Sequence, residues 1–269
     1  MKRSVNMADT SKVMFAELRR QEIAHFVQKN GKATVEDLCQ MFSVSPATIR
    51  NDLTELEKQG KLQRTHGGAI YRSPAGYELT TLEKTVKNVK QKEAIARRAL
   101  DLIHPGDVIA LDSGTTTYEL AKLLHTVPNL TVITNDLRIC AVLEPYPEIT
   151  VIMLGGMVRH NFHCTYGSTA LDTLDTFYID TAFVATNGFS LGRGLSTPRI
   201  EMAEIKHKMI GVAGRTVLMA DSTKAEKEAF VSVSSLEEID VLITDSAIDR
   251  EFAAALSELG LEVIVSESI

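Results

Sequence analysis

Four hydroxyl side chains beside one glycine are the residues of this chain best suited to chemistry. Ser113, Gly114 and the run Thr115, Thr116, Thr117 follow an apolar stretch and open the helical pattern of LDSGTTTYELAKLL (111–124). The first N–H groups of a helix are unpaired and carry partial positive charge, so this turn can bind a phosphate, with the hydroxyls as further donors. An ordinary Ser/Thr helix cap is the alternative interpretation. The spacing excludes a P-loop, and the absence of a second and third glycine excludes a dinucleotide fingerprint.

Small polar residues also stand at the ends of other apolar stretches. Ligands of an open parallel sheet bind at the carboxyl ends of its strands, so these residues are candidates for binding a hydrophilic ligand. Lys224 ends one such stretch, where its ammonium can meet a phosphate; a solvated surface lysine is the alternative. The candidates beyond the hydroxyl turn are Asp112, Asn135, Gly156, Asn187 and Lys224.

Alternating strands and helices must hold these residues in place. The pattern predicts strands at 108–111, 130–134, 150–154, 181–185, 216–220, 241–244 and 262–265, and helices at 82–103, 116–125, 137–145, 200–213 and 249–259. Near-continuous apolar strands between helices indicate a parallel sheet covered on both faces. We therefore expect an α/β fold with a doubly wound, mostly parallel, Rossmann-like sheet.

A second candidate site lies near the N-terminus, in TVEDLCQMFSVSPATIRNDL (34–53). The segment predicts two short helices joined by a turn, with Thr34 and Ser45 as their N-caps and Pro46 in the first turn of the second helix. Ile49, Leu53 and Leu56 form the buried stripe of that second helix. Its exposed end then carries small, amide and guanidinium side chains, which suits the major groove of DNA. The candidate contacts are Ser45, Ala47, Thr48, Arg50, Asn51 and Thr54.

The segment KLQRTHGGAIY (61–71) follows directly and predicts a hairpin around its His-Gly-Gly turn. A helix-turn-helix followed by a basic hairpin is a winged helix, so Arg64 and His66 join the candidate DNA contacts. The distribution of charge agrees with a DNA-binding N-terminal part, because basic residues are in excess there and acidic residues in the remainder. Residues 1–72 hold 12 Lys and Arg against 8 Asp and Glu, whereas residues 73–269 hold 17 against 27.

The three cysteines, Cys39, Cys140 and Cys164, are far apart and odd in number, which indicates reduced thiols and no disulfide framework. No apolar run is long enough to cross a membrane, and the N-terminus lacks a signal-peptide core. We therefore expect a cytoplasmic protein with no membrane partner.

The segment Arg19–Ala69 resembles the DeoR family of bacterial transcriptional regulators. The matching segments are RRQEI (19–23), SPATIRNDL (45–53) and GKLQRTHGGA (60–69). The resemblance implies a winged-helix DNA-binding domain fused to a sugar-phosphate sensor domain.

The strand ends resemble the DeoR sensor domain too, and more distantly ribose-5-phosphate isomerase and glucosamine-6-phosphate deaminase. The matching segments are LDSGTTT (111–117), TND (134–136), LGG (154–156), ATNG (185–188) and MADSTK (219–224). The resemblance implies that residues 113–117 hold the phosphate, and that Asn187, Arg199 and Lys224 face the sugar or its phosphate. The chain has Ala225-Glu226 where the family commonly has Phe-Gly.

Two alternatives remain beside a regulator. A sugar-phosphate isomerase or deaminase needs acid–base residues, but Asn187 replaces a carboxylate and no lysine lies in 188–199. The second alternative is a DNA-binding protein whose second domain only oligomerises. His160, His163 and Cys164 lack a complementary pair of metal ligands, so we expect no metal and no other cofactor.

We therefore predict a repressor of a carbohydrate-utilisation operon that is not an enzyme. Its domains are a winged helix at 14–72, a linker at 73–87 and an effector-binding and oligomerisation domain at 88–269. The expected partners are double-stranded operator DNA, a phosphorylated sugar or sugar alcohol, and further copies of the chain, as a dimer or a tetramer.

Overall fold

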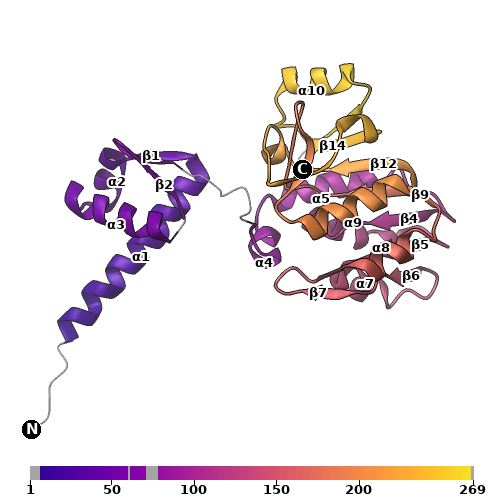
Figure 1. Ribbon diagram of the computed structural model, residues 1–269, viewed down its shortest axis with the longest axis horizontal. Helices are drawn as coiled ribbons and strands as arrows, with labels where there is room; N and C mark the ends of the chain where they lie inside the picture. Colours follow the sequence, from indigo (N-terminus) through magenta and orange to yellow (C-terminus); the bar gives the residue numbers. More distant parts are fainter. Residues whose placement is uncertain (1–6, 60, 71–77, 268–269) are drawn as a thin grey trace, which may run out of the picture. The chain divides into compact units, whose positions relative to one another are not determined.

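The computed structural model describes residues 7–59, 61–70 and 78–267, in two compact units, Met1–Tyr77 and Glu78–Ile269 (Figure 1). The expected linker at 73–87 falls partly outside the described residues. Its second part, from Glu78 onward, belongs to the second unit and contains the short helix α4 (Thr81–Thr85).

The first unit has the predicted order of a winged helix. It contains α1 (Met7–Asn30), β1 (Lys32–Thr34), α2 (Val35–Phe42), α3 (Pro46–Lys58), β2 (Gln63–Thr65) and β3 (Gly68–Ile70). Thr34 caps α2 in a reciprocal capping box with Asp37, and Ser45 caps α3, as predicted. The sequence also predicts a helix at about 15–29, and the structure begins that helix, α1, at Met7.

The wing is a three-stranded antiparallel sheet in the order β1-β3-β2, and β1 was not predicted. Glycine is required at position 68, where β3 pairs with β1, because a Cβ at this position would lie 2.0 Å from the carbonyl oxygen of Ala33. The core under the wing is built from the predicted stripe of α3 and from α1 and α2. Its fully buried members include Ile23, Val27, Leu38, Ile49, Leu53 and Leu56.

The second unit contains a seven-stranded parallel sheet, as the sequence predicted. Its spatial order is β15 (Glu262–Ser266), β14 (Val241–Asp245), β12 (Ala213–Met219), β9 (Ile179–Val184), β4 (Val108–Leu111), β5 (Thr131–Thr134) and β6 (Thr150–Met153). The order reverses beside β4, so the loops after β4, β9 and β12 meet at one edge of the sheet.

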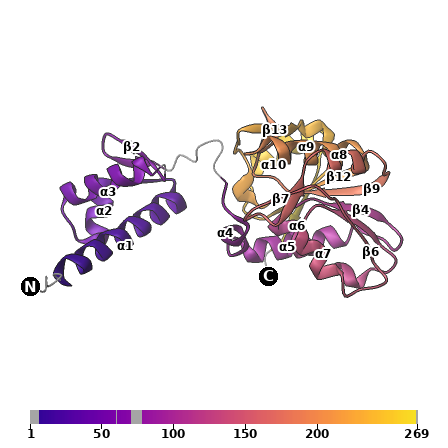
Figure 2. The ribbon, with the colours of Figure 1, turned by 60° about the horizontal axis from the view of Figure 1, so that its bottom comes forward.

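Helices cover both faces of this sheet (Figure 2). One apolar cluster joins the sheet to α5 (Val89–Leu100), α6 (Thr115–Ala121) and α7 (Leu137–Leu143), and the other joins it to α8 (Ser168–Leu174), α9 (Ile200–Gly211) and α10 (Arg250–Glu258). The fold is therefore doubly wound. Among the described residues, no helix is long and apolar enough to cross a membrane.

Four features of the second unit differ from the sequence prediction. The helix predicted at 82–103 is wrong as a single helix: Asn88, with a φ of 51°, separates α4 from α5. The hairpin of β7 (Met157–Arg159) and β8 (Cys164–Tyr166) was not predicted. Neither was helix α8, nor the small sheet of β10 (Gly188–Ser190), β11 (Gly194–Thr197) and β13 (Val231–Ser234).

Candidate functional site

The N-terminal end of α3 forms the first candidate site. The Ser45 hydroxyl accepts a hydrogen bond from the Thr48 amide at 3.2 Å and lies 2.9 Å from the Thr48 hydroxyl, which fixes the start of the helix. Ile49, Leu53 and Leu56 are buried against the core, so the opposite face of α3 projects from the unit. Of the sequence-predicted contacts on this segment, Thr48 and Thr54 are half-buried, and the exposed ones are Ser45, Ala47, Arg50 and Asn51.

The wing is fastened to α3 by Arg64. Its guanidinium donates to the Thr54 hydroxyl at 2.8 Å, and its backbone amide donates to the Glu57 carboxylate at 2.8 Å. The Thr54 hydroxyl in turn donates to the Arg50 carbonyl at 2.7 Å. The structure therefore brings Arg64 and Thr54 together, while His66 is exposed at the hairpin turn. A guanidinium held against the C-terminal half of α3 provides positive charge on the same helix whose N-terminal end carries donors that can read base edges.

Asp52 supports this arrangement, and the sequence analysis assigned it no role. Its buried carboxylate accepts from Arg19 Nε at 2.6 Å and from Arg20 Nε at 3.0 Å. An acidic residue within an otherwise buried helix stripe is the signal that could have identified this anchor between α1 and α3.

The hydroxyl turn after β4 forms the second candidate site. Gly114 is the N-cap of α6, and the first-turn N–H groups of that helix have no carbonyl acceptor within the helix. The Thr117 hydroxyl donates to the Asp112 carbonyl at 2.6 Å and to the Gly114 carbonyl at 3.1 Å, so it fixes the turn. Thr115 and Thr116 are buried and Ser113 is half-buried. The turn therefore offers backbone donors and hydroxyls to an anion.

Asp112 faces the interior and forms an ion pair with Lys206 of α9. Its carboxylate is fully buried and also accepts from the Ala185 amide at 3.0 Å, while Lys206 Nζ donates to the Ala185 carbonyl at 2.9 Å. Burial raises the pKa of Asp112, and the Lys206 ammonium opposes that rise. The pair joins the ends of β4 and β9 beneath the turn. The sequence analysis missed Lys206, although a lysine among the apolar positions of 200–213 was a usable signal.

Asn135 and Gly156 hold neighbouring loops in place. The fully buried Asn135 amide donates to the Thr165 carbonyl at 2.9 Å, and its oxygen accepts from the Ser113 amide at 3.2 Å. Gly156 has a φ of 124°, and a Cβ there would lie 2.4 Å from the Tyr166 carbonyl oxygen. Both residues are at the predicted edge of the sheet, where their contacts position the hydroxyl turn and the β7–β8 hairpin.

The other three predicted residues lie on separate loops. The Asn187 oxygen accepts from the Thr197 hydroxyl at 3.1 Å. Arg199 is exposed and pairs with Glu201 at 3.1 Å. Lys224 ends a short 3-10 helix (Ser222–Lys224), is half-buried, and forms no ion pair within the described part of the chain. Lys224 is therefore the free cation of this predicted set.

Arg138 and Lys92 are cations near this edge that the sequence analysis missed. Arg138 binds the buried Asp136 carboxylate at 2.7 Å, lies over the Tyr118 ring and donates to the Gly114 carbonyl at 3.4 Å. Burial lowers the pKa of Lys92 to about 8; the charge of Asp221 opposes this shift and that of Lys224 adds to it. Arg138 therefore reaches the turn through Gly114, whereas the Lys92 ammonium donates to the Lys84 and Lys87 carbonyls and holds the end of α4.

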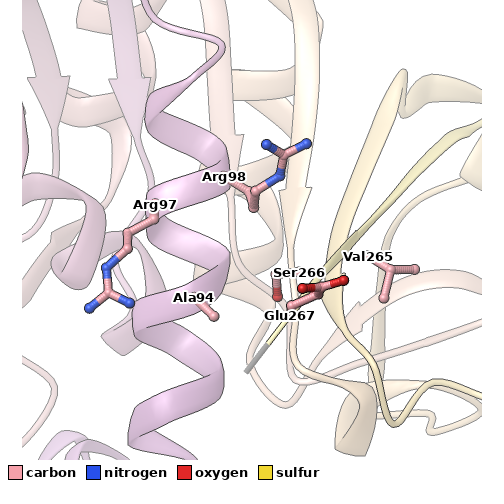
Figure 3. A pocket seen from close by; sticks show the side chains of 6 residues that line it. All are labelled: Ala94, Arg97, Arg98, Val265, Ser266 and Glu267. Carbon is pink, nitrogen blue, oxygen red and sulfur yellow. The ribbon is translucent and has the colours of Figure 1, made fainter. Parts of the chain in front are cut away.

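A hollow of about 380 Å³ lies between α5 and the end of β15 (Figure 3). The described residues that line it include none of the predicted effector contacts. They are Ala94, Arg97, Arg98, Val265, Ser266 and Glu267.

Comparison with known proteins gives matches in both units. Residues 19–75 match the DeoR-like helix-turn-helix domain, and residues 87–246 match the DeoR C terminal sensor domain. The HTH-type transcriptional regulator GolR of Listeria innocua is 33% identical over 254 residues, which cover 94% of this chain and 100% of GolR. The HTH-type transcriptional repressor GlcR of Bacillus subtilis is 34% identical, with 94% of this chain and 98% of GlcR covered. Among solved structures, ribose 5-phosphate isomerase A of Methanocaldococcus jannaschii has a TM-score of 0.38 and 18% identity, covering 52% of this chain and 55% of that chain.

Proposed function

Because this chain belongs to the DeoR family of transcriptional regulators, we propose that it represses a carbohydrate-utilisation operon until a phosphorylated sugar or sugar alcohol releases it from its operator. The observation that carries the proposal is the pairing, in one chain, of an exposed, capped recognition helix with a sensor unit whose strand ends converge on a hydroxyl turn. The name of its relative GlcR supports repression.

Operator contact comes from the exposed end of α3 in this proposal. Arg50 and Asn51 reach base edges in the major groove, and Ser45, Ala47 and Thr48 approach the groove wall. Arg64 and His66 approach the phosphate backbone from the wing. The Arg64–Thr54 hydrogen bond supports this assignment because it holds the guanidinium beside the recognition helix.

Effector binding occurs at the carboxyl edge of the sheet. The phosphate of the effector accepts hydrogen bonds from the first N–H groups of α6 and from the hydroxyls of Ser113, Thr115 and Thr116. The ammonium of Lys224 supplies a positive charge. Asn187 and Arg199 face the sugar. Asp112, Gly114, Thr117, Asn135 and Gly156 keep the loops in position. Lys224 is half-buried and forms no ion pair with the residues that the structure describes, which supports this assignment, because such an ammonium gains most from an incoming anion.

The regulator acts in the cytoplasm as a homo-oligomer, a dimer or a tetramer, because one winged helix covers too few base pairs for a selective operator. Residues 14–72 supply DNA binding in this proposal, and the second unit supplies the contacts between copies. Exposed apolar side chains on the second unit, such as Leu82 and Val86, support that division. Sedimentation of the full chain tests the homo-oligomer, since a monomer at micromolar concentration contradicts it.

A titration of operator DNA with candidate effectors tests the function directly. The full chain is incubated with DNA upstream of neighbouring carbohydrate genes and with a scrambled duplex, and a panel of phosphorylated sugars and sugar alcohols is then added. We expect selective binding that one compound reverses. The Lys224→Met variant should bind the DNA and ignore that compound, whereas Lys208→Met, which removes a charge paired with Asp175, should respond normally. Failure of every compound to weaken binding contradicts the effector proposal.

A further inference from the structure

Glu78, the first residue of the second unit, places its carboxylate among three donors. One oxygen accepts from Lys84 Nζ at 2.6 Å and from Asn187 Nδ2 at 3.3 Å, and the other accepts from an Arg159 nitrogen at 2.6 Å. The side chain is only 8% exposed. Burial alone raises the pKa of Glu78, but the two cations outweigh burial and lower it. Glu78 is therefore a buried, ionised anion bound by cationic side chains.

The three donors come from different elements, and each has a further contact besides Glu78. Lys84 lies on α4, Arg159 ends β7 and Asn187 follows β9. The Arg159 guanidinium lies 3.6 Å from the centre of the Phe162 ring, with Lys84 Nζ at 5.7 Å from the same ring, and Thr197 holds Asn187. These donors form a preorganised pocket for an oxyanion.

This donor cluster shares Asn187 with the proposed effector contacts. Helix α4 contacts α6, whose N-terminus is the hydroxyl turn. Burial lowers the pKa of Lys84, Glu78 opposes this, and the nearby charges of Lys224 and Lys206 lower it further. Lys84 is therefore close enough to Lys224, a proposed phosphate contact, for the two charges to interact.

The segment that carries Glu78 crosses several loops of the same edge. The Thr81 amide donates to the Asn161 carbonyl at 3.2 Å, and the Thr81 hydroxyl donates to the Phe162 carbonyl at 3.1 Å. Asn88 donates to the Asp221 carboxylate at 3.0 Å. A rearrangement of these loops therefore alters the contacts of residues 78–88, which follow the first unit in the sequence.

We propose that Lys84 and Arg159 form an additional anion subsite of the effector site, and that Glu78 is its built-in occupant, which the effector's phosphate displaces. The inference rests on the proposed function, since it assumes a phosphorylated effector at these strand ends. A phosphate dianion attracts Lys84 more strongly than a carboxylate does and repels Glu78 at the same time. Release of Glu78 frees residues 78–88 from the edge and carries the signal toward the winged helix.

Thermal unfolding of the full chain in graded concentrations of inorganic phosphate tests this, with chloride at equal ionic strength as the baseline. Glu78→Gln removes the competing charge while keeping an acceptor, so it should reach half-maximal stabilisation at about five- to tenfold less phosphate than the wild type. Glu93→Gln removes the same charge from the surface of α5 and should match the wild type. Lys84→Met should need more phosphate.

Hydrogen exchange provides a second measurement. If Glu78 had a purely structural role, phosphate would not alter the exchange rates of the amides near it. Phosphate should speed exchange at the Thr81 amide, whose bond to Asn161 breaks when the segment leaves. Unchanged or weaker phosphate binding by Glu78→Gln overturns the inference. If Lys224→Met still removes the phosphate response in that case, the proposed effector site stands without the displacement. Absence of any wild-type response to phosphate overturns both.

Discussion

Replacement of Lys206 by Met should be the most damaging single change to the sensor unit that leaves its apolar core intact. The side chains of Asp112 and Lys206 are 0% and 6% exposed. One Asp112 oxygen already lacks a hydrogen-bond partner within the described residues, so without Lys206 the carboxylate keeps only backbone amides, those of Ala185 and Ser113. Breaking a buried ion pair by removing one partner costs about 3–5 kcal/mol. For a unit of this size that corresponds to a fall in Tm of roughly 6–20 °C.

The deficit should depend on pH. Burial raises the pKa of Asp112, and loss of the Lys206 ammonium removes the main opposing charge, so the pKa rises further in the variant. A carboxyl group with a raised folded-state pKa contributes its full stability below the unfolded pKa, about 3.9, and loses it as the pH rises through the folded pKa. The variant should therefore lose more stability at pH 7 than at pH 4.5.

Urea unfolding of the full chain, followed through the transition of the second unit, measures the effect. Asp112→Asn combined with Lys206→Met removes both charges and should recover most of the loss, because no uncompensated charge stays buried. Lys208→Met, on the same helix but paired with the exposed Asp175, should change stability by less than about 1 kcal/mol. A loss below about 1 kcal/mol for Lys206→Met, or a double variant as unstable as the single one, would refute the reasoning.

Three further outcomes are expected. Arg50→Ala should weaken operator binding by about 1–3 kcal/mol in a footprinting titration while the unfolding transition is unchanged, and equal affinity would remove Arg50 from the interface. Lys224→Met should repress permanently in a reporter strain and Thr115→Val more weakly, because backbone donors remain; induction at the wild-type effector concentration would place the phosphate elsewhere. Ser45→Ala should destabilise the first unit by about 1 kcal/mol in thermal unfolding, since the Thr48 amide loses its cap, and an unchanged transition would show that the cap is dispensable.

Much of the fold followed from local patterns in the sequence. Thr34 and Ser45 were recognisable as caps because capping depends on residues three positions apart. All seven strands of the large sheet were predicted, since near-continuous apolar runs between helices have few other interpretations. The resemblance to the DeoR family, confirmed by both matched domains, also rested on contiguous segments.

Errors arose where the chain pairs across a distance. Strand β1 has only three residues and exists because it pairs with β3, about 35 positions further along the sequence. The predicted helix at 82–103 breaks at Asn88, whose side chain is held by Asp221 and Thr223, 133 and 135 positions away. Neither partner is visible in a local pattern.

The sequence by itself determined the seven strands of the large sheet, the capped recognition helix and the hydroxyl turn at a strand end, because each depends on neighbouring residues. Only the tertiary structure decided how the sensor's charges are paired. Lys206 meets Asp112 across 94 positions, Arg159 meets Glu78 across 81, and Asn187 meets Glu78 across 109. Such pairs form where the winding of the sheet brings distant loops to one edge, and low exposure there makes each unpaired charge costly. The folded arrangement therefore decides which polar residues bind one another and which, such as Lys224, are left for a ligand.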